Sequence, residues 1–323
     1  MSAAAQDGTR QRSWREVDGI VLLDKPAGMS SNQALQRARR LLSAAKGGHA
    51  GTLDPMATGM LPLCLGQATK ACGQLLGSTK AYRARLVLGV ATDTGDADGA
   101  VVTESAVPAL AREHVEQVLA GFTGAIEQVP PMYSALKRDG RPLYELARRG
   151  EQVTREARPI RVDRLELLSA GPRELTIKVV CSKGTYIRVL GEDIARALGT
   201  CGHLGELRRL WVEPFQGEDM VTLQVLEDWA GSGAAGEATA PWLLPVDRAF
   251  AGLPRLDLDV LQSLHLRQGR VLEAPAGTLG TGRARAYGPD GGFLGLIEIA
   301  GGGQVRVERL FIPGAGGTLP RQT

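Results

Sequence analysis

Residues 81–90, AYRARLVLGV, place an apolar side chain at every second position. Successive side chains of an extended strand point to opposite faces, so Tyr82, Ala84, Leu86 and Leu88 would share one face. A strand with one apolar face and one mixed face is typical of an antiparallel sheet that is open to water on one side. We therefore predict a half-buried strand here, and the elements around it decide the fold class.

The sequence before this strand predicts another strand and a helix. The apolar run GIVLLDKP at 19–26 predicts a buried strand that ends in a turn at Lys25-Pro26. We expect Ser31 or Asn32 to cap the helix that follows, because such side chains accept backbone N–H groups at helix starts. The apolar residues of this helix recur at helical spacing: Leu35, Ala38, Leu41 and Leu42.

The sequence after it continues to mix the two kinds of element. Residues 110–122 predict a helix, and residues 160–168 and 174–181 predict strands. A further helix is predicted in TYIRVLGEDIARALG (185–199), whose core face would consist of Ile187, Leu190, Ile194 and Leu198. Strands and helices do not alternate regularly, which predicts an α+β domain: a mixed, largely antiparallel sheet with flanking helices, and not a doubly wound fold.

The C-terminal part of the chain has a different pattern. Residues 229–242, WAGSGAAGEATAPW, are rich in Gly and Ala and predict a flexible connection. Beyond them, short alternating runs such as FLGLIEIA (293–300) and VRVERLFI (305–312) predict a small all-β domain. We therefore expect an N-terminal tail at 1–14, a main domain at 15–248 and a β domain at 250–315, as suits 323 residues.

The composition excludes several classes of protein. With 43% hydrophobic and 23% charged residues, the chain is expected to be soluble and globular, and no uncharged apolar run of about 18 residues predicts a membrane span. The N-terminus lacks the apolar core of a signal peptide. The four cysteines show neither zinc-site nor disulfide spacing, so we expect buried thiols in the reducing cytoplasm.

Charge is concentrated in one segment. Residues 131–165 contain nine Lys or Arg and five Asp or Glu, a net charge of +4, whereas the whole chain carries +3. Clustered basic residues are the usual source of sequence-independent affinity for nucleic acid. An ordinary solvated face would show the same pattern, so both interpretations stay open at this point.

One stretch has a single carboxylate, Asp54: residues 47–70, GGHAGTLDPMATGMLPLCLGQATK. Pro55 disfavours helical backbone at Asp54, and the surrounding glycines permit sharp turns and close approach of a ligand. A loop aspartate more often closes a turn or caps a helix, so residue types alone do not make Asp54 functional. The nearby acidic loop ATDTGDADG (91–99) is not an EF-hand, because Ser105 stands where the bidentate Glu is required.

The Asp54 stretch resembles the catalytic loop of the TruB family, the bacterial tRNA pseudouridine-55 synthases. Further stretches resemble this family in the same order, over about 18–213: DGIVLLDKPAGMSS, TDTGDADG, PPMYSALK, REARPI, CSKGTYIR and LRRL. The C-terminal β region is similar to the PUA-like RNA-binding barrel that such enzymes often carry. The resemblance therefore agrees with the α+β domain and the small β domain that the residues predict.

The resemblance implies an isomerase that converts uridine 55 in the T-loop of tRNA to pseudouridine. Asp54 falls on the nucleophilic aspartate of the family, and the base would have to flip out of the folded loop to reach it. No cofactor and no metal ion are implied. The implied partner is the T-arm of tRNA, with no membrane and no protein partner, and the chain would act as a monomer. A non-catalytic tRNA-binding protein or RNA-folding chaperone on the same scaffold is the alternative.

The resemblance also assigns roles to five other residues. His49 matches a position that contacts the RNA, Tyr82 the tyrosine that stacks on the target base, and Tyr186 a second tyrosine that would act in proton transfer. Leu207 matches a residue that lines the uridine pocket. Arg188 matches the arginine that pairs with the catalytic carboxylate and would keep Asp54 ionised.

Each of these residues also has an ordinary structural interpretation. An aromatic residue in an alternating strand is usually core, as is a leucine such as Leu207, and His49 could serve as a cap or a core residue. Arg188 could be a solvated or phosphate-facing arginine. Asp96 corresponds to an acid near the site of the family, and no chemistry is assigned to it.

Overall fold

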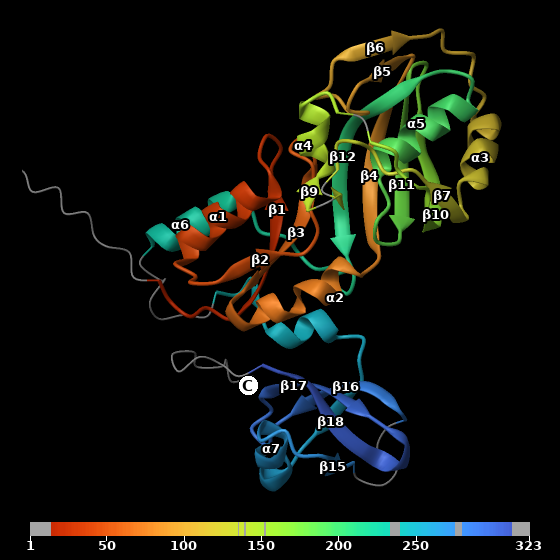
Figure 1. Cartoon of the computed structure of the whole chain (residues 1–323). Coiled ribbons are helices and arrows are strands. Elements are labelled where there is room, and N and C mark those ends of the chain that lie inside the picture. The colour runs from red at the N-terminus through yellow and green to blue at the C-terminus, as the bar shows by residue number, and fades with distance from the viewer. Residues whose placement is uncertain are drawn as a thin grey trace, which may run out of the picture.

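A computed structural model describes residues 14–134, 136–138, 140–151, 153–232, 240–274 and 280–311, with only the backbone at 137, 138, 142, 144 and 148. The predicted tail therefore lies outside the described residues except for Trp14. The main body is a nine-stranded sheet, which Figure 1 shows with helices at both ends. In spatial order its strands are β13 (Leu243–Leu244), β1 (Gly19–Lys25), β3 (Thr58–Leu65), β12 (Gly202–Val212), β4 (Lys80–Leu88), β11 (Glu174–Cys181), β10 (Arg158–Ala170) and β7 (Gly124–Gln128), while β2 (Gly47–His49) pairs with β3 off this path.

The pairing within this sheet is antiparallel at every described junction except that of β12 with β3. The predicted α+β class, with a mixed and largely antiparallel sheet, is therefore confirmed. The predicted strand at 81–90 is also confirmed, because β4 lies in the middle of the sheet between β12 and β11. Its apolar residues at alternating positions are all buried: Tyr82, Ala84, Leu86 and Leu88.

Helix α1 (Ser31–Leu42) corrects the predicted cap. Its N-cap is Ser30, whose side chain accepts a hydrogen bond from the Gln33 backbone N–H while the Gln33 side chain accepts one from the Ser30 N–H. This reciprocal pair satisfies two backbone donors, so it fixes the helix start one residue earlier than expected. The prediction of Ser31 or Asn32 as the cap is wrong, and Ser31 is buried in the first turn instead.

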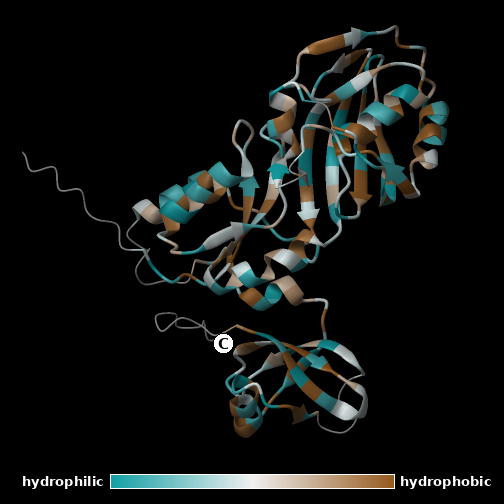
Figure 2. Ribbon diagram, viewed as in Figure 1, coloured by the Kyte–Doolittle hydropathy of each residue, from teal (hydrophilic) through white to brown (hydrophobic). Residues whose placement is uncertain are grey.

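Two pairs of helices pack against the two halves of the large sheet (Figure 1). Helix α1 lies beside α6 (Leu223–Gly231), and α5 (Ile187–Ala197) lies near α3 (Arg112–Gly121). The predicted core face of α5 is buried at Ile187, Leu190, Ile194 and Leu198. Figure 2 shows hydrophilic and hydrophobic residues mixed along both the helices and the central strands, as expected for elements with one apolar face. Helix and sheet thus bury their apolar faces against each other.

Shorter elements complete the main body. A hairpin of β5 and β6 follows β4, and a second hairpin with a short helix lies within 137–148. The two hairpins consist of β5 (Val90–Thr92), β6 (Val101–Glu104), β8 (Lys137–Arg138) and β9 (Arg141–Pro142), and the short helix is α4 (Leu143–Arg148). Three further short helices are η1 (Gly66–Ala71), α2 (Cys72–Leu76) and η3 (Val246–Phe250).

The C-terminal residues form a curled β half-barrel of the PUA-like kind, as expected. Its five strands follow the order β14-β16-β17-β18-β15, and helix α7 (Val260–Arg267) packs against two of them. The strands are β14 (Arg255–Asp257), β15 (Leu272–Glu273), β16 (Gly282–Tyr287), β17 (Phe293–Ile299) and β18 (Gln304–Leu310). The two alternating runs quoted above are β17 and β18.

The Gly/Ala-rich segment at 229–242 is not the crossing point between the two sheets. It begins in the last turn of α6, and the rings of Trp229 and Trp242 pack edge to face at 5.4 Å; residues 233–239 lie outside the described part. Strand β13 then pairs with β1, so the chain leaves the large sheet only after η3. Trp229 and Trp242, both partly buried against the main hydrophobic core, hold the two ends of this segment on the main body.

The two sheets share a hydrophobic core. Phe250 of η3 packs against Phe293 and Phe311 of the C-terminal domain, with ring centroids 6.2 and 5.7 Å apart. This cluster continues into the large sheet through Ile20 and Met60. On the rim, the Lys70 ammonium donates to the Leu310 carbonyl at 2.9 Å and lies 5.6 Å from the Phe311 ring.

Candidate active site

Asp54 lies in the loop that joins β2 to β3. Its neighbour Leu53 is fixed by Ser31, whose hydroxyl accepts the Leu53 N–H at 2.8 Å and donates to the Leu53 carbonyl at 3.2 Å. The Asp54 carbonyl accepts the N–H of Ala57, and the Pro55 carbonyl accepts the N–H of Gly28. The loop is therefore held from both sides, which places the Asp54 side chain in a defined position.

Arg188, in the first turn of α5, meets Asp54 directly. Its Nε lies 3.0 Å from Asp54 Oδ2 and its Nη2 donates to Oδ1 at 3.4 Å. Its remaining donors go to the carbonyls of Thr94 at 2.8 Å and Tyr133 at 2.7 Å. The Arg188 side chain is only 6% exposed, so the guanidinium is fixed by four different residues when Asp96 is included. The predicted pairing of Arg188 with Asp54 is present.

Asp96 supplies a second carboxylate to the same arginine. Its Oδ2 lies 3.5 Å from Arg188 Nε, and its side chain is 8% exposed. The other oxygen accepts the Thr94 hydroxyl at 2.6 Å and the Asp98 N–H at 3.2 Å. The acidic loop at 91–99 is thus a turn closed by Asp96, and it presents the Thr94 carbonyl to Arg188.

The electrostatics of Asp54 oppose full ionisation. Although 35% of its side-chain surface is accessible, the surrounding protein removes enough water to raise the pKa of the carboxyl above its ordinary value. Arg188 offsets part of this rise, Asp96 adds to it, and the Lys25 ammonium lowers it slightly. Arg188 therefore favours the ionised form of Asp54, against the effect of burial.

Lys25, at the end of β1, lies under the same loop and is fully buried. Its ammonium donates to the carbonyls of Pro26 and Met29, both at 2.8 Å, and of Pro55 at 3.2 Å. Burial lowers the pKa of Lys25 to about 8, and the Asp54 carboxylate counters part of that fall. Lys25 therefore ties the chain before α1 to the residue that follows Asp54.

Arg209 of β12 holds the two ends of the loop and is 1% exposed. Its Nε donates to the Met60 carbonyl at 2.7 Å and its Nη2 to the Gly51 carbonyl at 3.1 Å. Gly59 has a φ of +97°, and a Cβ there would lie 2.1 Å from the Arg209 carbonyl, so only glycine fits this approach. The glycines around Asp54 thus allow β3 and the loop to pack closely on β12.

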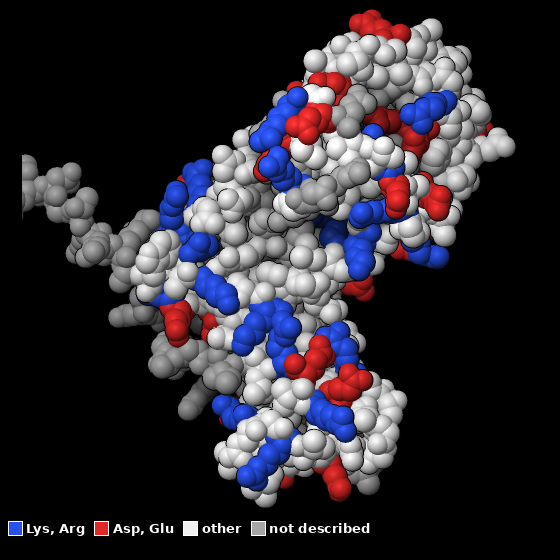
Figure 3. Space-filling view, in the orientation of Figure 1, with Lys and Arg blue, Asp and Glu red and all other residues white. Residues whose placement is uncertain are grey.

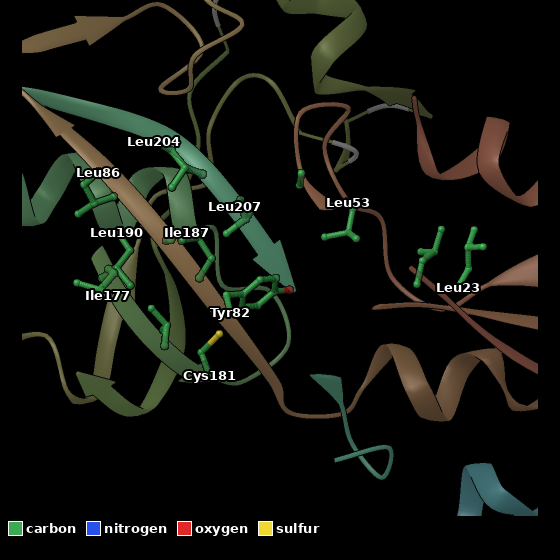
Figure 4. Close-up of a cluster of buried hydrophobic side chains, with 14 of the residues drawn as sticks. Leu23, Leu53, Tyr82, Leu86, Ile177, Cys181, Ile187, Leu190, Leu204 and Leu207 are labelled. Atoms are coloured by element: carbon green, nitrogen blue, oxygen red, sulfur yellow. The ribbon is translucent and has the colours of Figure 1, made fainter. Parts of the chain in front are cut away.

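Tyr82 and Leu207 lie on neighbouring strands beside this loop, and each is 8% exposed. Figure 4 shows the Tyr82 ring projecting from β4, with its hydroxyl directed toward the side on which Leu53 lies, and Leu207 beside the ring. Burial raises the pKa of the Tyr82 hydroxyl, and the adjacent Arg209 guanidinium offsets part of that rise. Both side chains belong to the main hydrophobic core, which covers most of the Tyr82 ring.

Tyr186 precedes α5 as its N-cap. Its backbone is held by Gln128, and its phenol lies beside the Ser134 hydroxyl. Burial raises the pKa of Tyr186 above 10, which keeps the phenol protonated at neutral pH. The free site therefore presents a hydrogen-bond donor here and not a phenolate.

His49 lies at the end of β2, opposite Leu63 of β3. Burial and the nearby Arg209 charge lower its pKa, which keeps the imidazole neutral at pH 7. Its Nδ1 is buried and has no hydrogen-bond partner among the described residues. His49 directly precedes the loop that carries Asp54.

Basic side chains border the site at the surface. Figure 3 shows Lys and Arg over the α1 region, over the α4 region and at the junction with the C-terminal domain, around a paler central area. In the predicted basic segment, Arg161 pairs with Asp163 and Arg164 with Glu166, so β10 neutralises part of the charge locally. The side chains of Lys137, Arg138 and Arg148 lie outside the described part.

Two further properties concern cofactors and membranes. Within the ranges that the structure describes, no three His, Cys, Asp or Glu side chains are grouped as metal ligands would be. Over the same ranges, each helix is too short or too polar to cross a bilayer.

The four cysteines are all free thiols. Cys64 and Cys181 are buried, whereas Cys72 and Cys201 are partly buried.

Three residues of the site were not predicted: Lys25, Arg209 and Gln128. The side-chain alternation along β12 could have placed Arg209 near the site, because a residue two positions after Leu207 faces the same side of the sheet. Lys25 ends an apolar run whose residues are buried on both faces, which indicates that the lysine is buried as well. No local pattern marks Gln128, whose contact spans 58 positions in the sequence.

Three family models match this chain in succession. They are the N-terminal domain of TruB family pseudouridylate synthase at 39–187, the C-terminal domain of tRNA pseudouridylate synthase B at 188–251, and the C-terminal domain of pseudouridine synthase II TruB at 254–311. The last match covers the small β half-barrel, and the first two cover the large sheet.

Proteins named tRNA pseudouridine synthase B are similar to this chain over nearly its full length. That of Aromatoleum aromaticum is 53% identical and covers 92% of this chain and 93% of its own. That of Xanthomonas axonopodis is 48% identical, with coverages of 92% and 95%. A chain in the crystal structure of a Cbf5-Nop10-Gar1 complex matches with a TM-score of 0.68 and 26% identity, over 91% of this chain and 85% of that one. The chain therefore belongs to the TruB family of pseudouridylate synthases.

Proposed function

We propose that this chain is a tRNA pseudouridine synthase that isomerises uridine 55 in the T-loop, with Asp54 as the nucleophile. The observation that carries the proposal is the Asp54 carboxylate held 3.0 Å from a buried arginine on a glycine-framed loop. A protein that only binds RNA gains nothing from a half-buried carboxylate, which repels phosphate and costs desolvation. The relatives named above act, by their names, on tRNA.

The reaction needs a nucleophile, a freed base and a shift of protons, with no net gain or loss of atoms. Attack by the Asp54 carboxylate on a carbon of the target nucleotide accompanies cleavage of the bond between the ribose C1′ and N1 of uracil. The base turns, and C5 bonds to C1′. The proton of C5 leaves, N1 gains one, and the carboxylate is released, so that substrate and product are isomers. Neither a redox partner nor a metal ion enters this balance.

The neighbouring side chains suit a flipped uracil. Tyr82 and Leu207 offer a ring face and an aliphatic surface next to the Asp54 loop, and stacking of this kind compensates for the lost base pairing. His49 directly precedes the Asp54 loop and is partly exposed, so we assign its ring a contact with the RNA around the target. Because Tyr186 is protonated at neutral pH, we assign it a donor role in the free site, ahead of the proton shift.

The test is direct. The purified chain is incubated with an unmodified tRNA transcript, and pseudouridine is mapped along the product, with a transcript carrying cytidine at position 55 as the control. We expect pseudouridine at position 55 alone and none in the control. Tight binding without pseudouridine would replace the isomerase by the chaperone alternative, and pseudouridine at another position would overturn the assignment to the T-loop.

A further inference from the structure

Gln128, the last residue of β7, makes an unusual contact with the start of α5. The Tyr186 N–H donates to its Oε1 at 2.8 Å, and its Nε2 donates to the Tyr186 carbonyl at 3.0 Å. Its side-chain amide thus pairs with both backbone groups of one residue, as a neighbouring strand would. Gln128 is 4% exposed, so water does not compete for these two hydrogen bonds.

The contact satisfies one of the unpaired backbone N–H groups at this helix start. The first N–H groups of a helix have no partner within the helix and are usually satisfied by a capping side chain. The N-cap Tyr186 provides no such cap, and its carbonyl also accepts the N–H of Leu190 at 3.1 Å. Gln128 therefore fixes the position of the residue from which α5 begins, two positions before Arg188.

The chain that follows Gln128 returns to the same helix turn. The Tyr133 carbonyl accepts Arg188 Nη2 at 2.7 Å, and the Pro130 carbonyl accepts Arg155 Nη1 at 3.1 Å. Residues 128–133 are thus fastened to α5 at Tyr186 and at Arg188. A shift of Gln128 would move both attachment points, and with them the guanidinium that pairs with Asp54.

We propose that Gln128 is a positioning residue for the isomerisation: its amide holds the first turn of α5 so that Tyr186 and Arg188 face Asp54. The inference rests on the proposed function and deepens it. Gln128 touches neither Asp54 nor the target base, and it acts through the Tyr186 backbone. Displacements of about 1 Å at such supporting positions are enough to slow an otherwise intact site severely.

The chemistry of the contact requires an amide. A glutamate of the same shape would keep an acceptor for the Tyr186 N–H but would set a second oxygen against the Tyr186 carbonyl. A methionine of similar length would fill the space and form neither hydrogen bond. The pair Gln128→Glu and Gln128→Met therefore separates hydrogen bonding from packing. Glu127, the preceding residue on β7, is exposed and gives the matched control Glu127→Met.

The experiment measures three quantities on the full-length variants: the single-turnover rate with bound tRNA transcript, the tRNA dissociation constant, and backbone hydrogen exchange over residues 186–190. We expect both Gln128 variants to lose about 30-fold or more in rate, with tRNA affinity within about threefold of the parent. We expect exchange at 186–190 to rise at least about tenfold in both, and to stay unchanged in Glu127→Met.

A double-mutant cycle with Arg188→Met checks that Gln128 acts through the site. In that background Gln128→Met should cost less than about threefold, because the residue whose placement it secures is absent. Equal costs in both backgrounds, a rate within threefold of the parent, or unchanged exchange at 186–190 would each overturn the proposal. A parent chain that makes no pseudouridine refutes the proposed function, and the exchange measurement still decides the Gln128 contact.

Discussion

In the large sheet, Arg188 is 6% exposed where it meets Asp54 and Asp96, whereas in the C-terminal sheet Arg283 and its partner Glu308 are each 36% exposed. Both arginines make short hydrogen bonds. Arg283 donates to Glu308 at 2.7 and 2.9 Å, and Arg188 donates to the Tyr133 carbonyl at 2.7 Å. The difference lies in the water around them. A pair in water is screened and replaceable, whereas a buried pair becomes costly when one member is removed.

Burial of the Asp54 carboxylate has a cost in stability. Burial raises the pKa of Asp54 even with Arg188 in contact, so the folded chain binds a proton there more readily than the unfolded chain. By linkage, the ionised carboxylate lowers the free energy of unfolding as the pH rises above its ordinary pKa. The large sheet thus holds the Asp54 carboxylate at the expense of stability.

The largest expected effect separates the two arginines. Arg188→Met leaves Asp54 and Asp96 without their cation and two carbonyls without a donor, so we expect a loss of about 3–5 kcal/mol in the free energy of unfolding. Arg283→Met removes a solvated pair and should cost less than about 1 kcal/mol. Urea unfolding of both variants measures the two values, and equal losses would break the comparison.

Tyrosine gives the second comparison. Tyr82→Leu removes a ring face from the site, and since base stacking is worth about 1–3 kcal/mol, catalytic efficiency should fall about tenfold to a hundredfold. Tyr82→Phe keeps the ring and should stay close to the parent. In the C-terminal domain Tyr287 is 3% exposed and donates to Asp247, so Tyr287→Leu should lower the melting temperature instead.

Steady-state assays and thermal melts on the three tyrosine variants check this contrast. A Tyr82→Leu variant with full activity per folded molecule would show that Tyr82 is a core residue only.

The smallest expected effect concerns pH. If ionised Asp54 reacts, activity falls on the acid side with a midpoint above the ordinary aspartate value, because burial raises the pKa of Asp54. Asp96→Asn removes a negative neighbour, lowers the pKa of Asp54 and should move this midpoint to lower pH. Asp257→Asn, at the exposed Arg255 pair, should leave it unchanged. A pH profile of the single-turnover rate measures the shift, and a shift to higher pH in Asp96→Asn would contradict the role of Asp96.

The sequence predicted the elements well where the pattern is local. Alternation identified β4, β17 and β18, and helical spacing identified α1 and α5, because burial of one face repeats every few residues. The start of α1 was missed because two serines stand side by side and only the reciprocal contact with Gln33 selects Ser30. The flexible connection predicted at 229–242 is tied to the main body at both ends, because the rings of Trp229 and Trp242 pack on each other.

The site was predictable only in part. The resemblance named Asp54 and Arg188, and the structure brings them together from positions 134 residues apart. The supporting contacts of Lys25, Arg209 and Gln128 depend on which strands become neighbours, and a single sequence does not state that order. The raised pKa of Asp54 is likewise a property of the assembled site, since burial by several elements causes it.

The central claim is that the lone carboxylate of the 47–70 stretch is the attacking group. Asp54→Asn keeps the shape of the side chain and removes its charge, so the single-turnover rate of pseudouridine formation should fall about a thousandfold or more while the tRNA dissociation constant stays within about threefold. Urea unfolding at pH 7 checks that the variant is folded, with Asp96 left as the carboxylate that pairs with Arg188. A single-turnover rate within about tenfold of the parent would contradict the account, since Asp54 could not then be the nucleophile.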